Sequence, residues 1–341
     1  MRLIGKILFV ILLLLLVAYF LGPKAEYDKV SASPLELNMD VNQLEDFIIN
    51  REKNTPGIKK NNEAQFIWAH GTKEKTPYSV VYLHGFTATH KEGFPIVQNF
   101  AARYDANLYL PRLAQHGLSD VDAMKDLTPN ALIDSAREAI AMAKLMGEKV
   151  IIISTSTGSS YASYLANGDK DIAAQIMLSP NFAVNDSKAK KITGRWGKQM
   201  FKQAMGSDYR EWEAKNPKVK EYWQTKARIE GYIAMQAMLD QTMTEETWSK
   251  NKVPTFIGYY YKDESAHDQV ISIPAINRYI EVAAIPKDKL KVVPFSDAQG
   301  HVIGSQFMND NWQSVQDEIF VFADKVLGME KKHSLVVTYP E

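Results

Sequence analysis

One stretch of the chain, Lys149 to Tyr161, restricts the fold more than any other. It begins with an apolar, β-branched run, Val150 to Ile153, which is typical of a strand buried on both faces of a parallel sheet. Small and hydroxylated residues follow at once, from Ser154 to Gly158, and a helical spacing of apolar residues begins at Tyr161. Such a strand, turn and helix hold the central residue, Ser156, above the sheet edge. An ordinary Ser/Thr-rich loop with a helix N-cap explains the pentapeptide equally well.

The same alternation of strands and helices extends to both sides of this stretch. Buried strands are predicted at 78–83, 107–110, 150–153, 173–178, 254–260 and 289–295. Helices are predicted at 94–104, 128–147, 274–282 and 312–327. Before the strand at 78–83, the sequence predicts a helix at 42–51, a strand at 65–69 and a charged hairpin tip at 73–75. Alternation of this kind is typical of a parallel sheet covered on both faces. We therefore expect an α/β fold with a doubly wound, mostly parallel sheet.

The alternation stops between residues 183 and 250, where no strand pattern is visible. Residues 222–243 are predicted to form one long helix with an apolar stripe. We interpret the segment as a helical cap inserted after a sheet strand. A stripe of methionine and aromatic residues is more often core than ligand surface, but in a cap it would line an adaptable, apolar acyl pocket.

The first 25 residues are expected to be a membrane segment. Arg2 and Lys6 precede an unbroken apolar run, Ile7 to Leu21, which could just span about 30 Å of hydrocarbon. Positive charges before the run favour an N-terminus in the cytoplasm. We predict an uncleaved signal anchor with the catalytic domain exported, because Gly22 to Ala25 is a poor cleavage site. The alternative is a cleaved signal and a secreted protein.

Composition argues against several classes of function. Forty basic residues balance forty acidic ones without an obvious block of like charge, which argues against a nucleic-acid partner. The chain has no cysteine, which excludes disulfides, thiolate metal sites, cysteine nucleophiles and an acylated lipoprotein N-terminus. No His/Asp pair shows metal-ligand spacing, so neither a metal nor another cofactor is expected.

Three predicted loops, each at the carboxyl end of a strand, carry side chains that could act together. In chain order these are Ser156, an aspartate at 263 or 268, and His301. Ligand sites in open α/β sheets lie at those ends. A serine hydroxyl needs a base to accept its proton, and the base needs a carboxylate to orient it. The order predicts Ser156 as nucleophile, His301 as base and one of the two aspartates as acid.

With these residues in view, the chain resembles the α/β-hydrolase family over most of residues 65–330. It is most similar to the branch of monoglyceride lipases, carboxylesterases and serine-aminopeptidase-like enzymes. The matching motifs are Leu83–Thr87, Leu110–Leu113 with Gln115–Gly117, Ser154–Gly158, Asp268–Ser272 and Gly300–Val302. The resemblance implies an α/β-hydrolase core at 65–182 and 251–330 and ester hydrolysis through an acyl-enzyme. It also implies an oxyanion hole made by the backbone N–H groups of Phe86 and Thr157.

The chain departs from the family pattern at two places. Ser154 stands where the family has the first glycine of its serine motif. The acid loop offers two carboxylates, and the residues after Asp268 are the more similar to the family, so Asp268 is preferred and Asp263 comes second. His84 and His116 are expected to hold their loops rather than to act as bases, and His267 is expected at the surface.

The predicted function is a membrane-anchored serine hydrolase that cleaves small-molecule carboxylic esters with apolar acyl or aryl groups, monoacylglycerol-like esters included. A serine peptidase or amidase of the same branch is one alternative. A non-catalytic binding module with this fold is another, although such modules typically lose the serine or the histidine. The expected organisation is an anchor at 1–25, a lead-in at 26–64, the two core segments around a cap at 183–250, and a tail at 331–341.

Overall fold

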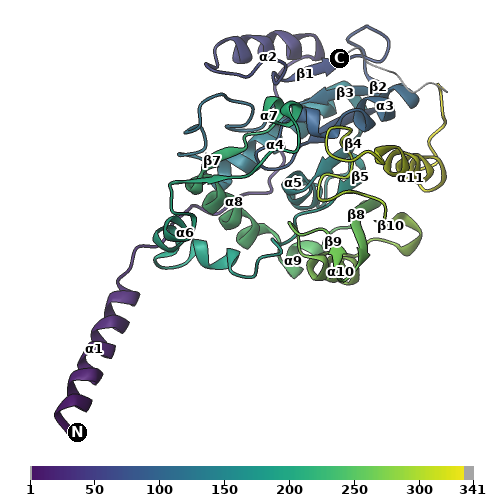
Figure 1. The fold of residues 1–341 in the computed structure, drawn as a ribbon. Helices are drawn as coiled ribbons and strands as arrows, with labels where there is room; N and C mark the ends of the chain where they lie inside the picture. The colour runs from purple at the N-terminus through teal and green to yellow at the C-terminus, as the bar shows by residue number, and fades with distance from the viewer. Residues whose placement is uncertain (1, 334–341) are drawn as a thin grey trace.

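The computed structural model describes residues 2–333, so residues 334–341 of the predicted tail lie outside its described part. A central sheet runs through the molecule in the order β1-β3-β2-β4-β5-β8-β10, with β9 paired to β8 (Figure 1). The strands are β1 Gln65–Ile67, β2 Thr76–Leu83, β3 Asn107–Leu110, β4 Gly147–Thr155, β5 Ile172–Leu178, β8 Thr255–Asp263, β9 Ala266–His267 and β10 Leu290–Phe295. All pairs are parallel except β1 with β3 and β9 with β8. The expected doubly wound, mostly parallel sheet is confirmed.

Alternate residues of the central strands face two separate apolar layers. On β2, Val80 and Tyr82 pack in one layer, and Val81 and Leu83 pack in the other. The first layer is covered by α3 (Ile96–Arg103) and α11 (Trp312–Lys325), and the second by α4 (Pro129–Met146), α5 (Thr157–Leu165) and α10 (Ile273–Val282). Because both faces are buried, the strands read as continuous apolar runs in the sequence.

The ends of α4 lie at the residues that mark them in the sequence. The Thr128 hydroxyl accepts a hydrogen bond from the Ala131 amide at 3.1 Å, and Pro129 follows at the first helical position, where no N–H is needed. Gly147 ends the helix and also begins β4. A Cβ at Gly147 would lie 2.4 Å from the Ser79 amide nitrogen, so only glycine permits this direct connection from helix to strand.

The lead-in packs beside the sheet edge. The predicted helix near 42–51 is present as a short 3-10 turn, η1 Val41–Gln43, followed by α2 Leu44–Lys53. The expected hairpin tip at 73–75 is wrong, because β1 pairs with β3 and not with β2. Lys73 instead forms an ion pair with Glu45 of α2 at 2.7 Å, which holds the connecting segment against the lead-in.

The segment between β5 and β8 differs from its prediction in two ways. Its elements are η3 Ala189–Thr193, α6 Gly197–Met205, β6 Tyr209–Glu211, α7 Pro217–Tyr222, β7 Lys226–Arg228, α8 Ile229–Thr242 and α9 Glu245–Trp248. The expectation of no strand is wrong, since β6 and β7 form an antiparallel pair. The long helix predicted at 222–243 begins only at Ile229. Tyr222 ends α7 instead, and the residues from there to Arg228 leave the helical path, because the Gln224 amide donates to the Thr87 carbonyl at 2.7 Å and β7 bonds to β6.

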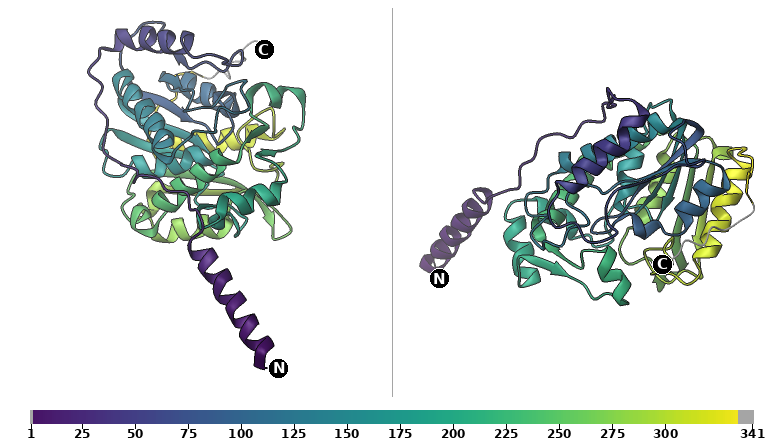
Figure 2. Two further views of the ribbon diagram at one scale, coloured as in Figure 1. Left: turned by 90° about the vertical axis from the view of Figure 1, so that its left-hand side faces the viewer. Right: turned by 90° about the horizontal axis from the view of Figure 1, so that it is seen from above.

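An apolar helix, α1 (Arg2–Phe20), projects from the body of the molecule (Figures 1 and 2). Its window Leu3–Phe20 has a mean hydropathy of 2.8 and is wholly unburied. By length and composition this helix could cross a membrane, and a signal sequence has the same properties.

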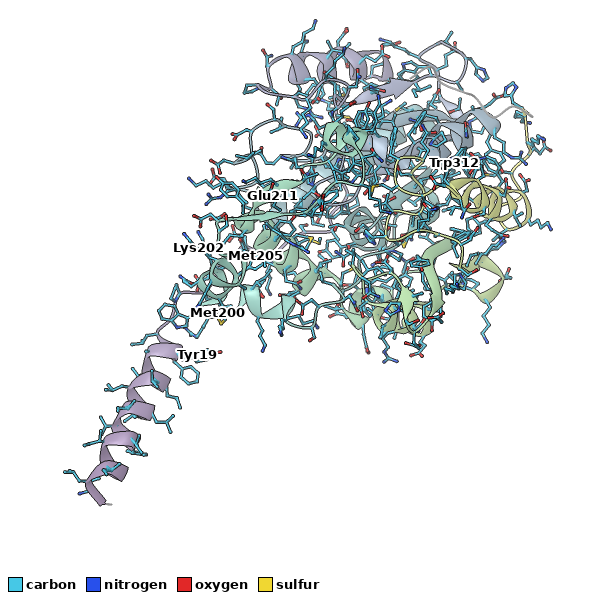
Figure 3. All side chains as sticks on the ribbon, viewed as in Figure 1. Tyr19, Met200, Lys202, Met205, Glu211 and Trp312 are labelled. Carbon is cyan, nitrogen blue, oxygen red and sulfur yellow. The ribbon has the colours of Figure 1, made fainter. Side chains whose placement is uncertain are left out.

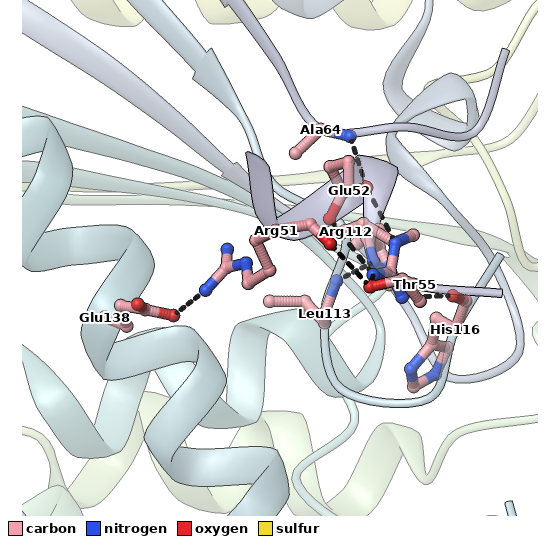
Figure 4. Close-up of polar contacts among 9 residues, drawn as sticks. Arg51, Glu52, Thr55, Ala64, Arg112, Leu113, His116 and Glu138 are labelled. Carbon is pink, nitrogen blue, oxygen red and sulfur yellow. Dashed lines mark hydrogen bonds and ion pairs between the residues drawn. The ribbon is translucent and has the colours of Figure 1, made fainter. Parts of the chain in front are cut away.

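A buried ion pair joins the lead-in to the loop after β3 (Figure 4). Arg112 donates from Nε and Nη2 to the two carboxylate oxygens of Glu52 at 2.8 and 3.0 Å, and both side chains are less than one-tenth exposed. Glu52 also accepts the Ala64 amide, while Arg112 reaches the Thr55 hydroxyl and the His116 carbonyl. These contacts fix α2 against the loop that carries His116.

We expect Glu52→Gln to lower the free energy of unfolding by about 3 kcal/mol, because it leaves the Arg112 charge buried without its counterion. Glu245→Gln is the matched control, since Glu245 pairs with Arg278 on the surface, where solvent screens the pair and its loss should change the stability little. Urea titration of the full chain in detergent, followed by circular dichroism, measures both. Equal shifts in the two variants would contradict the assignment of Glu52 as a structural anchor.

Candidate active site

Ser156 lies on the sharp turn between β4 and α5. Its backbone has φ 54° and ψ −120°, in a region that few residues other than glycine adopt, and its amide donates to the Leu178 carbonyl at 2.9 Å. A Cβ at Gly158 would lie 1.9 Å from the Leu83 carbonyl oxygen, so the position two after Ser156 must be glycine. The expected strand–turn–helix is therefore present, with Ser156 7% exposed.

Ser154, which replaces the family's first glycine, is accommodated by its surroundings. Its side chain is fully buried, and its hydroxyl shares a hydrogen bond with the Ser159 hydroxyl at 3.0 Å and contacts the Ile176 carbonyl at 3.3 Å. A buried hydroxyl with partners costs little free energy. The departure from the family pattern does not disturb the turn.

Asp268, and not Asp263, is paired with His301. The Asp268 Oδ2 atom lies 2.7 Å from His301 Nδ1, and its Oδ1 atom accepts the amides of Val270 and Ile271 at 2.8 and 3.3 Å. Asp263 is exposed in the turn from β8 to β9, where its carboxylate accepts hydrogen bonds from Ser265 and Ala266. The geometry therefore brings the preferred aspartate to the histidine and leaves the second one apart.

Ser156 and His301 both contact one short segment that follows β5. The Ser156 amide donates to Leu178, and its carbonyl accepts the Asn181 amide at 3.0 Å. The Ser179 hydroxyl donates to the His301 carbonyl at 2.6 Å. The segment from 178 to 181 thus fixes the loops of the serine and the histidine relative to each other.

The Phe86 and Thr157 amides lie in the two loops that meet at Ser156. Within residues 2–333, neither amide donates a hydrogen bond to a protein acceptor. The Gly85 carbonyl accepts the Ala88 amide at 3.2 Å and bonds His84 Nδ1 at 3.0 Å, which holds the first loop. A Cβ at Gly85 would lie 3.2 Å from Ser156 Cβ, so this loop is in direct contact with the serine.

A buried glutamate, Glu92, adjoins this site and was not singled out from the sequence. Its carboxylate accepts the Gly85 amide at 2.6 Å and the Tyr82 hydroxyl at 3.1 Å, and its side chain is 2% exposed. In the sequence it follows His90 and Lys91 in a polar stretch. Nothing in that pattern distinguishes it from a solvated loop charge, so only tertiary contacts reveal it.

The carboxylates and the histidine of the site have shifted pKa values. Burial raises the pKa of Asp268, but attraction to His301 and hydrogen bonds from His301 and two amides outweigh it, so its pKa lies below the usual range. Burial lowers the pKa of His301, but Asp268 and more distantly Glu92 outweigh it, so its pKa lies above 6.5. Burial raises the pKa of Glu92 to about 7, against the effect of the Gly85 amide.

The other histidines have different environments. Burial lowers the pKa of His84 well below 6.5 and that of His116 to about 4, so both rings are neutral. His84 Nε2 accepts the Leu113 amide at 3.1 Å, and His116 Nδ1 donates to the Ala114 carbonyl at 2.8 Å. These contacts agree with the expectation that both rings hold loops. His267, expected at the surface, is half-buried in β9.

The cap segment covers the site with apolar side chains. The Tyr232 ring of α8 lies 5.0 Å from the Phe86 ring, and Met235 Sδ lies 3.6 Å from the Thr157 hydroxyl. Trp223 packs with Ala88, in the loop after β2, and with Val302, next to His301.

In the described part of the chain, no group of three or more His, Cys, Asp or Glu side chains is placed to hold a metal ion.

We expect the His301 imidazole to titrate above pH 6.5, because Asp268 stabilises its protonated form. Asp268→Asn should lower this pKa, and Glu92→Gln should lower it by less; Asp263→Asn is the matched control and should leave it unchanged. NMR of the full chain labelled with ¹³C-histidine, with His301→Gln to assign the signal, measures the titrations. An equal effect of the two aspartate variants would contradict the pairing.

The chain was compared with family models, curated proteins and solved structures, and only solved structures are similar to it. No family model matches the sequence, and no curated protein matches it. Among solved structures, a metagenome-derived lipolytic enzyme from work on LipS and LipT is 13% identical over 79% of this chain and 99% of its own, with a TM-score of 0.63. Est1E of Butyrivibrio proteoclasticus, with ferulic acid bound, is 16% identical over 78% and 95%, with a TM-score of 0.53.

A third similar structure is an enol-lactonase from Burkholderia xenovorans LB400, which is 14% identical over 78% of this chain and 98% of its own, with a TM-score of 0.50. At these identities the similarity concerns the course of the backbone, and the chemistry must be argued from this chain's own residues. The sheet order, the serine turn and the solved structures together show that the chain has the α/β-hydrolase fold.

Proposed function

We propose that the protein is a serine hydrolase of carboxylic esters, with Ser156 as nucleophile, His301 as base and Asp268 as acid. The observations that carry the proposal are the Asp268–His301 hydrogen bond and a serine on a strained turn, both attached to the segment from 178 to 181. Within residues 2–333, the nearby Phe86 and Thr157 amides donate to no protein acceptor. A serine of this kind is activated by a neighbouring imidazole, and the carboxylate sets the imidazole's tautomer.

The reaction would follow from these positions. His301 Nε2 takes the proton of the Ser156 hydroxyl as its oxygen attacks the ester carbonyl. The negative charge on the carbonyl oxygen is stabilised by the Phe86 and Thr157 amides. The bond between the acyl carbon and the alkoxy oxygen then breaks, and the alcohol leaves with the proton from His301. Water attacks the acyl-enzyme by the same route and releases the acid and Ser156.

The apolar surroundings favour acyl or aryl esters as substrates. Phe86, Tyr232 and Met235 lie over the serine loop, and a methionine adapts to acyl groups of different shape. The ferulic acid bound by Est1E and the lipolytic activity named for LipS and LipT are properties of those proteins, and they are compatible with this substrate class.

A peptidase of the aminopeptidase-like branch would need a free acidic group for the amino terminus of its substrate. Glu92, whose carboxylate accepts the Gly85 amide, is buried and also bonded to the Tyr82 hydroxyl, so it is not free to bind an amino group. The lack of a free carboxylate at this loop, within residues 2–333, favours ester hydrolysis.

For location, we propose that α1 is a membrane anchor with the catalytic domain exported, since Arg2 and Lys6 lie at its N-terminal end.

We expect the wild-type chain to react with a fluorophosphonate probe and to hydrolyse nitrophenyl esters. Ser156→Ala should lose the labelling and reduce kcat by about 10⁴-fold or more, because no other group can form the acyl-enzyme. Ser187→Ala, at an exposed serine of the cap segment, is the matched control. A series of esters from acetate to palmitate reports the acyl pocket. Absence of labelling in folded wild-type protein would refute the catalytic function and favour a binding module.

A further inference from the structure

The cap segment carries a cluster of positive charge that the balanced overall composition conceals. Residues 187–207 contain six basic residues and no acidic one. The basic residues are Lys188, Lys190, Lys191, Arg195, Lys198 and Lys202. Lys198 pairs with Glu230 and Lys202 with Asp208, whereas the other four form no ion pair within residues 2–333. The basic residues form no uninterrupted block of like charge in the sequence, because neutral residues lie between them.

The same segment exposes large apolar side chains. Trp196, Met200 and Met205 are 37%, 45% and 40% exposed. Outside residues 3–21 the only other large apolar side chains as exposed as these, in the part of the chain that the structure describes, are Leu35, Phe47, Ile49, Val121 and Val270. Of the nine residues of α6, only Gly197 is buried, and Phe201 is half-buried. The helix therefore has an outer face that combines lysine and methionine.

This surface is attached to the end of α1. The Trp196 amide donates to the Pro23 carbonyl at 2.7 Å, its indole Nε1 donates to the Ala18 carbonyl at 3.2 Å, and Arg195 donates to the Gly22 carbonyl at 3.2 Å. A Cβ at Gly22 would lie 1.9 Å from the Trp196 indole nitrogen, so the ring rests directly on this glycine. The indole thus fixes α6 at the point where α1 leaves the body.

The figures show the consequence of this attachment. α1 extends away from the body, and α6 lies beside its end (Figures 1 and 2). Met200, Met205 and Lys202 lie near the Tyr19 end of α1 (Figure 3). A bilayer crossed by α1 therefore ends close to the outer face of α6.

We propose that the cap surface formed by residues 187–207 rests on the lipid bilayer that α1 enters. Trp196, Met200 and Met205 would lie in the interfacial region, and the unpaired cations would contact anionic headgroups. Amphipathic helices that lie on membranes combine these residue types, and basic residues near the surface add attraction to anionic lipids. The proposal rests on α1 being a membrane anchor but not on catalysis.

The docked surface is connected to the candidate active site by ring contacts. Phe201, on the inner side of α6, lies 6.3 Å from Tyr232, which lies 5.0 Å from Phe86. The membrane-facing helix is therefore two ring contacts from the loop beside Ser156. Docking would place the cap of the hydrolase at the surface in which amphiphilic esters reside.

The absence of cysteine makes a direct test possible, because any single cysteine can be labelled selectively. The full chain, with Ser156→Ala to remove catalysis, is reconstituted into nanodiscs of phosphatidylcholine with or without phosphatidylglycerol. Met200→Cys and Met205→Cys carry an environment-sensitive nitrobenzoxadiazole dye. Phe47→Cys and Ile49→Cys are matched controls, since both lie exposed on α2, far from α1 in Figure 1.

We expect the dye at 200 and 205 to shift to shorter wavelength and to be quenched by nitroxide-labelled lipid, more strongly in anionic discs. The dye at 47 and 49 should show neither effect. The variant Lys188→Glu/Lys190→Glu/Lys191→Glu should lose the anionic preference, and Lys53→Glu/Lys287→Glu/Lys331→Glu, at three exposed lysines elsewhere, should keep it.

Two results would overturn the proposal. One is a dye at 200 and 205 that stays solvated and unquenched in both kinds of disc. The other is a full chain that does not associate with the discs, since α1 then fails to enter a bilayer. Because the readout uses the Ser156→Ala background, neither result depends on whether the protein hydrolyses esters.

Discussion

The candidate site depends on the close approach of α5 to the end of β2. Gly158 lies against the Leu83 carbonyl with no room for a Cβ, and this contact brings the Ser156 turn beside the Gly85 loop. At this close approach the Ser156 backbone has a positive φ, which is unfavourable for a residue other than glycine. Hydrogen bonds to Leu178 and Asn181 maintain this conformation. Nothing else in the site could be arranged as it is if α5 were displaced from the strand.

A second set of contacts holds the loop of Gly85 and Phe86, which carries one of the two proposed oxyanion donors. The Gly85 amide is bonded to Glu92 and its carbonyl to His84 and Ala88, so the peptide between Gly85 and Phe86 has little freedom. Glu92 is bonded in turn to Tyr82, which bonds Thr155 immediately before the serine turn. A preorganised donor of this kind needs no rearrangement when charge develops on a bound substrate.

The cap connects this interior to the outside of the molecule. On its inner side Tyr232 contacts Phe86 and Met235 contacts Thr157, and its outer side carries the basic and apolar face of α6. The hydrogen bonds from Trp196 to Ala18 and Pro23 attach this outer face of the cap to the end of α1. A chain that is neutral overall therefore has a positive face on one side, which is a property of surface distribution and not of composition.

Much of the fold could be predicted because its signals are local. The strand runs, the Thr128–Pro129 helix start and the loops of Ser156, Asp268 and His301 depend on short stretches whose backbone is determined by neighbouring residues. The roles of these three residues stay predictions. Where tertiary contacts compete with local preference, prediction failed: the residues before Ile229 have helical spacing, yet hydrogen bonds to Thr87 and β6 keep them extended.

By itself, the sequence indicated the alternating strands and helices of the core, the serine turn and the two aspartates that could serve the histidine, but not β6, β7 or β9. Only the tertiary structure showed which of those aspartates contacts the histidine, because Asp263 ends β8 and Asp268 lies five residues later, and Asp268 alone is bonded to His301. It also decided that Glu92 is buried and that Arg195 and Trp196 of the basic segment contact the end of α1. These features depend on contacts between residues far apart in the chain, for which a linear pattern carries no signal.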